Sequence, residues 1–243
     1  MLSAIVLSAL IIGHRGASGH LPENTLPAFA KAIEMGADGI ELDVWPDVNG
    51  HPVVIHDEDL ERTYRQKGKV TGMRVEDLSV LGVPRYEDVL ELAKGKLIVF
   101  TELKGMHEDK VADAIHRAVS ENGWSYDALP VIGFDHDQLE RLKDANPAIV
   151  TGASFSRKML EHIPRDKHAA FMVSKASSIH ASAINPDYRL VTPEIVEKAH
   201  AAGLKVNVWT VNSPAAMDKL LALRVDAIMT DYPDRLHGKI HGE

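Results

Sequence analysis

The chain has 243 residues and carries 27 basic against 35 acidic side chains, a formal net charge of −8 that is spread along the sequence. This balance argues against a nucleic-acid-binding surface, which needs a basic face. The absence of cysteine excludes disulfides and thiolate metal sites. The length and the even apolar content, with no low-complexity stretch, predict one domain over residues 1–243.

The first twelve residues, MLSAIVLSALII, resemble the apolar region of a signal peptide. They lack a basic start and run into His14 without a convincing cleavage site, and they are too short to span a bilayer. The end of this run is therefore predicted to be the first buried strand. No stretch has the character of a basic amphipathic membrane helix, so no stable membrane insertion is expected.

Short segments rich in Ile and Val alternate with segments of helical period, which is typical of a parallel sheet covered by helices. The predicted strands are Ile11–His14, Gly39–Asp43, Val53–His56, Leu97–Leu103, Pro130–Phe134, Ile149–Ser154, Ser182–Asn185, Val206–Val211 and Ala227–Thr230. The predicted helices are Thr25–Met35, Tyr86–Ala93, Asp109–Asn122, His136–Ala145, Pro193–Ala202 and Pro214–Leu223. This is one strand more than the eight of a (β/α)8 TIM barrel, and the size and rhythm favour that barrel over an open doubly wound sheet.

Two features depart from the regular rhythm. The segment between Asp43 and Val53 is too short for a helix, and Asn49-Gly50 predicts a tight turn. One crossover helix is therefore expected to be missing between strands 2 and 3. The tail from His237 onward is predicted to be frayed.

Two carboxylates, Glu41 and Asp43, lie two residues apart on a predicted strand. Alternate strand residues point to the same face, so both carboxylates reach into one volume, where they repel unless a cation, a proton or an arginine lies between them. Oxygen ligands suit a hard divalent ion such as Mg²⁺ or Ca²⁺. An isolated pair of this kind is more often a solvated rim, but His14 and His56 each end an apolar run on either side of it.

Polar residues gather at the C-terminal ends of the predicted strands, which share one rim in a barrel, the rim that carries the active site. Arg15 precedes Gly16 and suits bidentate contact to a phosphate. Glu102 and Lys104 add a third carboxylate and a second cation, and Asp57 follows His56 as an orienting carboxylate or a loop cap. Each signal is weak alone. Together the two histidines, three carboxylates and two cations indicate phosphodiester cleavage.

The segments GHRGASGHLPENTLPAF, GADGIELDVWPDVNGHPVVIHDEDLERT, ELK, VNVWTVN and DAIMTDYPDRL resemble the successive motifs of the glycerophosphodiester phosphodiesterase family, from about Ile11 to Leu236. The resemblance implies a (β/α)8 barrel with a small insertion at about residues 57–83 that caps the site. It implies a small cytoplasmic enzyme that uses one divalent ion, Mg²⁺, Ca²⁺ or Mn²⁺. The implied substrates are glycerophosphodiesters such as glycerophosphocholine and glycerophosphoethanolamine, which yield sn-glycerol 3-phosphate and an alcohol.

The resemblance also implies roles for individual residues. Sorted by role, they are the general acid and base His14 and His56, the metal ligands Glu41, Asp43 and Glu102, the phosphate-binding Arg15 and Lys104, the pocket aromatics Phe134 and Trp209, and the supporting Glu23 and Asp231. With Asp57 as a further supporting group, these residues form the predicted site.

Several alternatives remain open from the sequence. The nucleophile is either the glycerol 2-hydroxyl or water, either histidine serves as the acid, and a homo-oligomer is compatible with the chain. Tyr64 stands where the family often has a second Thr, and this departure leaves the preferred alcohol open. A lysophospholipase D acting on lysophospholipids would need an apolar channel, which the short polar insertion argues against. A catalytically silent phosphodiester-binding barrel is disfavoured by the intact catalytic set.

Overall fold

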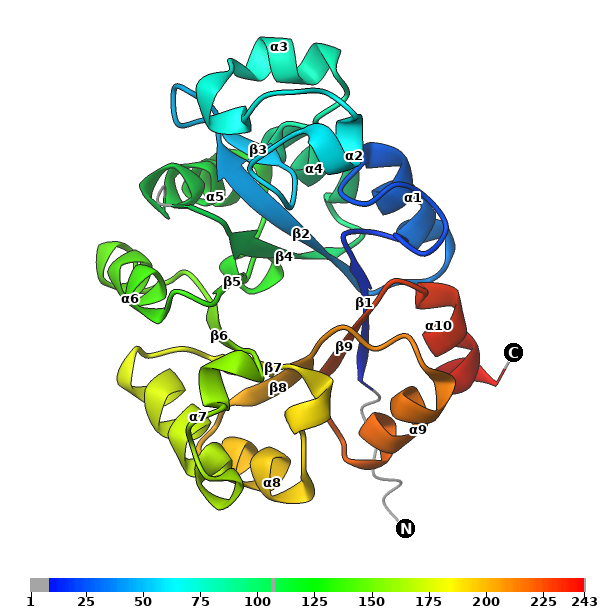
Figure 1. Ribbon diagram of the computed structural model, residues 1–243, viewed down its shortest axis with the longest axis vertical. Helices are drawn as coiled ribbons and strands as arrows, with labels where there is room; N and C mark the ends of the chain where they lie inside the picture. Colours follow the sequence, from blue (N-terminus) through cyan, green and yellow to red (C-terminus); the bar gives the residue numbers. More distant parts are fainter. Residues whose placement is uncertain (1–8, 106–107, 243) are drawn as a thin grey trace.

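Eight parallel strands close into a barrel in the computed structural model, which describes residues 9–105 and 108–242 (Figure 1). The barrel strands are β1 (Leu10–His14), β2 (Gly39–Pro46), β4 (Ile98–Leu103), β5 (Val131–Gly133), β6 (Thr151–Phe155), β7 (Ala183–Pro186), β8 (Lys205–Val208) and β9 (Ala227–Thr230). Closure is complete because β1 pairs in parallel with both β2 and β9. The predicted TIM barrel is confirmed.

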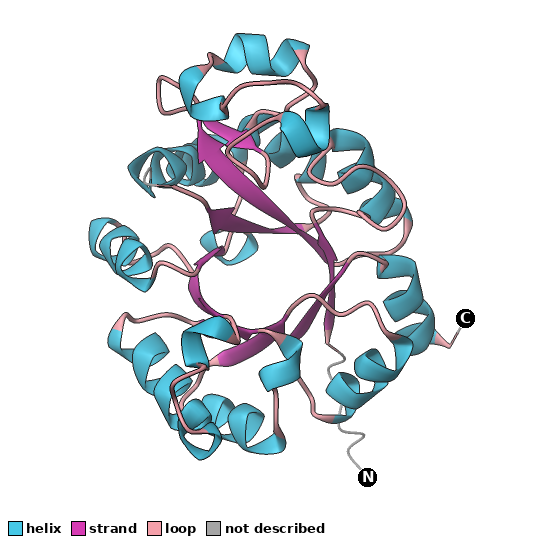
Figure 2. Cartoon of the chain, viewed as in Figure 1, coloured by secondary structure: helices cyan, strands magenta, loops and turns pink. Residues whose placement is uncertain are grey.

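Helices surround the barrel and cover its outer face (Figure 2). They are α1 (Leu26–Glu34), α4 (Tyr86–Ala93), α5 (Glu108–Asn122), α6 (His136–Ala145), α7 (His168–Ser178), α8 (Pro193–Ala201), α9 (Pro214–Ala222) and α10 (Pro233–His241). The local sequence determines where several of these helices begin. Thr25 and Thr192 each accept a hydrogen bond at the N-terminus of a helix that has proline in its first turn.

Two of these helices were not predicted. The α7 helix buries small residues, Ala169 and Ala176, beside Met172, so its apolar periodicity in the sequence is weak. The prediction of a frayed tail is wrong, because α10 continues to His241. Leu236 on this helix is fully buried and Ile240 packs against the main core, so tertiary packing holds the C-terminal segment.

The segment after β2 forms a hairpin and not a barrel strand. β3 (Pro52–Val54) runs antiparallel to β2, with Val54 opposite Val44. The missing crossover helix is thereby confirmed, and the extra strand candidate is explained. β2 continues past the rim, β3 returns to it, and Ile55 N donates to Asp43 O at 3.0 Å. His56 was expected at the C-terminal end of a barrel strand; it reaches the rim on this returning chain.

The residues between β3 and α4 form a small cap with its own apolar core. The cap contains α2 (Glu61–Tyr64), a 3-10 turn (Val70–Gly72) and α3 (Val75–Val80). Its buried side chains, separate from the main core, are Val53, Ile55, Leu60, Val70, Val75, Leu78 and Val83. The cap lies over the hairpin and beside α1 (Figure 1). Among the described residues, no helix combines the length and the apolarity needed to cross a bilayer. Met1 to Ser8 of the signal-like run lie outside the described residues.

One buried carboxylate ties the hairpin to the cap. Asp47 is 3% exposed, and its Oδ1 accepts hydrogen bonds from the backbone N–H groups of Asn49 and His51 at 2.7 and 2.8 Å. Its Oδ2 accepts from Val75 N at 2.9 Å, at the start of α3. Burial opposes the ionised form, but these hydrogen bonds outweigh it and hold the pKa of Asp47 below its ordinary value.

The Asp47→Asn variant is expected to lose about 1–3 kcal/mol of unfolding free energy at neutral pH, because buried N–H donors lose a charged acceptor. The pKa of Asp47 is lower in the folded state, so its contribution is complete above the ordinary aspartate pKa of about 3.9 and is lost progressively as the pH falls from there through the lower folded-state pKa. Urea unfolding at pH 7 and at about pH 3 checks this, with the exposed Asp144→Asn as control. An equal loss at both pH values would contradict it.

Candidate active site

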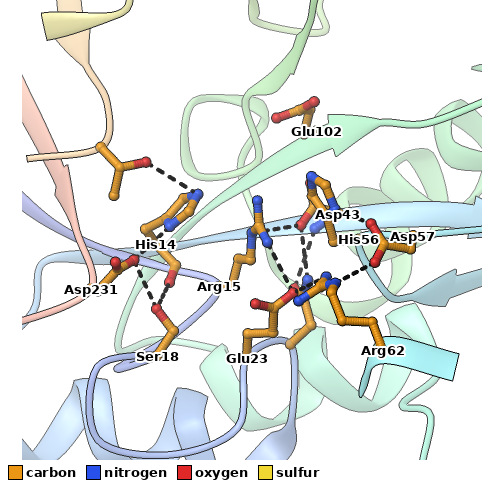
Figure 3. Close-up of polar contacts among 12 residues, drawn as sticks. His14, Arg15, Ser18, Glu23, Asp43, His56, Asp57, Arg62, Glu102 and Asp231 are labelled. Atoms are coloured by element: carbon orange, nitrogen blue, oxygen red, sulfur yellow. Dashed lines mark hydrogen bonds and ion pairs between the residues drawn. The ribbon is translucent and has the colours of Figure 1, made fainter. Parts of the chain in front are cut away.

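The predicted functional side chains meet at one rim of the barrel because strand register makes them neighbours. His14 at the end of β1 is opposite Glu41 on β2, and Asp43 is opposite Glu102 on β4. His14, Glu41 and Glu102 line a cavity of about 260 Å³. The side chains around this cavity, with their polar contacts, come from different segments of the chain (Figure 3). Every predicted site residue lines the cavity or contacts a residue that does.

Three carboxylates form a compact cluster at this rim. Glu41, Asp43 and Glu102 each present an oxygen, and these oxygens all lie within 4.8 Å of one another. Glu41 and Asp43 are 2% and 1% exposed. Asn24, which was not among the predicted site residues, donates from Nδ2 to Asp43 Oδ2 at 2.8 Å and orients that carboxylate.

Crowding shifts the pKa values of all three carboxyl groups. Burial and the charge of Asp43 raise the pKa of Glu41 to about 8 and also raise the pKa of Glu102. Burial would raise the pKa of Asp43 too, but the charges of Lys104 and Arg15 outweigh it and lower that pKa. Full ionisation of the cluster is therefore disfavoured near neutral pH.

The cluster fits a hard divalent ion. Asp43 Oδ1 is buried and accepts no hydrogen bond from any described residue, although Lys104 Nζ lies 3.2 Å away. An oxygen-only donor set with an unfilled buried acceptor matches the preference of Mg²⁺, Ca²⁺ and Mn²⁺.

Two cations border the carboxylates. Lys104 Nζ pairs with Glu102 and with Asp43. Arg15 Nε lies 3.3 Å from Asp43 Oδ2, and its NH1 donates to Glu23 Oε1 at 2.9 Å. Arg15 has φ of 54° and is followed by Gly16, so the chain turns sharply after β1 and directs the guanidinium into the cavity wall.

Each of the two histidines is held by a carboxylate at Nδ1. His14 Nδ1 lies 2.7 Å from Asp231 Oδ1, and its Nε2 lies 3.4 Å from Thr210 Oγ1. His56 Nδ1 lies 2.6 Å from Asp57 Oδ1. The pKa values of Asp57 and Asp231 are lowered, so both are ionised acceptors and each Nδ1 carries the proton. Nε2 of each ring is thereby left as the reactive atom.

The two rings differ in their electrostatic surroundings. Burial disfavours the charged form of His14, but the hydrogen bond to Asp231 and the charge of Glu41 outweigh it and raise its pKa. Burial lowers the pKa of His56, and the charges of Arg15 and Lys104 act in the same direction. The two imidazoles therefore favour different protonation states.

The remaining contacts involve two predicted aromatic residues and two residues that were not predicted. Phe134 and Trp209 line the cavity and meet edge to face, with ring centroids 5.4 Å apart. Ser18 donates to Asp231 at 2.9 Å, and Asn212 binds the other oxygen of Asp231. Ser18 and Asn212 were not predicted, because a serine or asparagine far from its partner in sequence has no characteristic spacing. Their only signal in the sequence is their position within the motifs quoted above.

Comparison with known proteins agrees with this geometry. The model of the glycerophosphoryl diester phosphodiesterase family matches residues 14–235. The glycerophosphodiester phosphodiesterase of Caldanaerobacter subterraneus is 32% identical over 95% of this chain and 97% of its own. The crystal structure of a glycerophosphodiester phosphodiesterase from Agrobacterium tumefaciens, 29% identical, superposes with a TM-score of 0.80 over 95% of this chain and 99% of that one.

A phosphodiesterase from Oleispira antarctica, solved in complex with the product sn-glycerol-3-phosphate, shares the fold at 24% identity, with a TM-score of 0.79 over 96% of this chain and 97% of that one. The match of the family model over nearly the whole chain, together with relatives above 30% identity, identifies this chain as a member of the glycerophosphoryl diester phosphodiesterase family of enzymes.

Proposed function

We propose that this enzyme hydrolyses small glycerophosphodiesters, such as glycerophosphocholine and glycerophosphoethanolamine, to sn-glycerol 3-phosphate and an alcohol. The observation that carries the proposal is one cavity of about 260 Å³ whose wall combines clustered carboxylates, two cations and two carboxylate-held histidines. These groups match the needs of phosphodiester cleavage, which are charge neutralisation and two proton transfers.

Glu41, Asp43 and Glu102 would hold one divalent ion, either Mg²⁺, Ca²⁺ or Mn²⁺. When bound, the ion would act as a Lewis acid on a phosphoryl oxygen. Arg15 and Lys104 would bind the remaining phosphoryl oxygens, since both border the carboxylates in the cavity wall.

The two histidines would carry the proton transfers. The Nε2 of one ring accepts a proton from the attacking hydroxyl, and the other ring donates a proton to the departing alcohol oxygen. If water attacks, sn-glycerol 3-phosphate forms directly. If the glycerol 2-hydroxyl attacks, the product is a cyclic phosphate, which water then opens with the two rings in exchanged roles to give sn-glycerol 3-phosphate. Asp57 and Asp231 hold the rings through Nδ1 and so keep both Nε2 atoms facing the substrate. Phe134 and Trp209, which also line the cavity, would contact the glycerol or the alcohol.

The size of the cavity supports a small substrate over a lysophospholipid. A volume of about 260 Å³ suits a phosphate with two short substituents. A groove of about 550 Å³ lies between α1 and the cap, lined by Leu26, Tyr64 and Val83 among others, but it shares no lining residue with the cavity. The groove is therefore distinct from the catalytic cavity and does not enlarge it for an acyl chain.

Release of sn-glycerol 3-phosphate from glycerophosphocholine and glycerophosphoethanolamine tests the proposal. We expect release to stop with chelator and to return with Mg²⁺, Ca²⁺ or Mn²⁺. His56→Ala should lower turnover about 10²–10⁴-fold, because a proton-transfer group is lost. No release with any ion would refute the proposal. Lysophospholipids would then be tested as substrates, and no turnover of those either would favour a catalytically silent binding barrel.

Lysophosphatidylcholine should be a much poorer substrate than glycerophosphocholine, with kcat/KM lower by at least about 10-fold, because its acyl chain does not fit the cavity. Competition between the two substrates in one reaction, followed by product analysis, measures the ratio directly. Equal or better turnover of the lysolipid would favour the lysophospholipase D assignment.

Lys104→Gln is expected to bind the divalent ion about 10-fold more tightly, because the lysine ammonium competes with the ion for Asp43 and Glu102. Turnover should fall, because the variant loses a cation that binds the phosphate. Titration calorimetry with Mn²⁺ measures the affinity without turnover. Unchanged or weaker binding would show that Lys104 and the ion do not compete.

A further inference from the structure

Arg62, on the cap helix α2, bridges two carboxylates of the site, Asp57 and Glu23. Its Nε donates to Asp57 Oδ2, and its NH2 donates to Glu23 Oε1 at 2.7 Å. Each of these two carboxylates also contacts a residue of the proposed mechanism. Asp57 Oδ1 holds His56 Nδ1 at 2.6 Å, and Glu23 Oε1 also accepts from Arg15 NH1 at 2.9 Å. The bridging guanidinium lies between the two carboxylates (Figure 3).

We infer that Arg62 is a positioning residue that fixes the His56 ring and the Arg15 guanidinium relative to each other. The inference rests on the proposed function, since it assigns Arg62 to the same reaction. Arg62 reaches neither the carboxylate cluster nor the cavity wall among the described residues, and it acts through Asp57 and Glu23.

The geometry of the bridge requires a planar fork. Nε and NH2 of a guanidinium donate in fixed, nearly parallel directions, so one side chain can hold two carboxylates at a set separation, whereas a lysine ammonium acts as a point charge. Both Asp57 oxygens are engaged, one by His56 and one by Arg62, so the carboxylate cannot rotate without breaking a contact. The Arg62 hydrogen bond is also the largest cause of the lowered pKa of Asp57.

The competing interpretation is an ordinary surface ion pair. The Arg62 side chain is 49% exposed, and exposed ion pairs generally contribute little to the stability of a fold. Arg117 provides the matched control, because it is 53% exposed and pairs with Glu87 between the outer helices α4 and α5. A surface role predicts that both arginines behave alike when replaced.

The test compares Arg62→Gln with Arg117→Gln on glycerophosphocholine. We expect Arg62→Gln to lower kcat/KM about 10–100-fold, the usual cost of removing a group that orients a reactive histidine, with the melting temperature close to that of Arg117→Gln. Arg62→Lys keeps the charge without the fork and should also lose about 10-fold, which provides a second variant should Arg62→Gln fail to fold. Activity of both Arg62 variants within twofold of Arg117→Gln would overturn the inference.

A double-mutant cycle with Asp57→Asn separates positioning from a general structural effect. If Arg62 acts through Asp57, Arg62→Gln should cost little more in the Asp57→Asn background, whereas independent effects would multiply. Full multiplication of the two losses would overturn the inference.

Nitrogen-15 NMR of the His56 ring makes the test independent of turnover. The wild-type ring should show Nδ1 protonated, and Arg62→Gln should give a mixture of tautomers. A wild-type enzyme that cleaves no glycerophosphodiester but shows this Arg62-dependent change would refute the proposed function and leave the positioning role of Arg62 standing. An unchanged ring signal would overturn the positioning role alone.

Discussion

The structure of the site depends on one electrostatic constraint, the confinement of three mostly buried carboxylates in one wall of the cavity. Oxygens of Glu41, Asp43 and Glu102 within 4.8 Å of one another repel strongly when ionised. Lys104 and Arg15 at the edge of the cluster offset part of this repulsion, and the remainder contributes to raising the pKa of Glu41 to about 8. Lys104 and Arg15 are held by the carboxylates but are also the cations proposed to bind the phosphate. The contacts that offset the repulsion within the cluster therefore involve the same side chains that the proposed reaction needs.

The hairpin of β2 and β3 explains how this cluster gains its second histidine. A regular β/α repeat would place the next strand beside β2 in the barrel wall, and β4 already occupies that position. The chain instead folds back along the part of β2 that extends past the rim, so His56 approaches the carboxylates from outside the barrel. The cap core and the Asp47 hydrogen bonds hold this returning segment in place.

The sequence predicted most of the barrel, because buried parallel strands have strong Ile and Val runs and because glycines and prolines mark the helix ends. It predicted the clustering of His14, Glu41 and Glu102 since strand ends share a rim. β3 was counted among the barrel strands, although the tight turn predicted at Asn49-Gly50 is typical of an antiparallel hairpin. The partners Asn24, Asn212 and Arg62 also escaped, since each acts through a contact distant in sequence, and the α7 helix lacked a clear apolar face.

The contact between His14 and Asp231 spans 217 positions of the chain, the same separation as that of the strand partners that close the barrel between β1 and β9. During synthesis the carboxylates and both cations leave the ribosome early, whereas the group that orients His14 emerges almost last. The carboxylate cluster needs only β2 and β4, whereas the contact that holds His14 needs the closed barrel. Long-range closure of this kind is slow, and it makes activity a late reporter of complete folding.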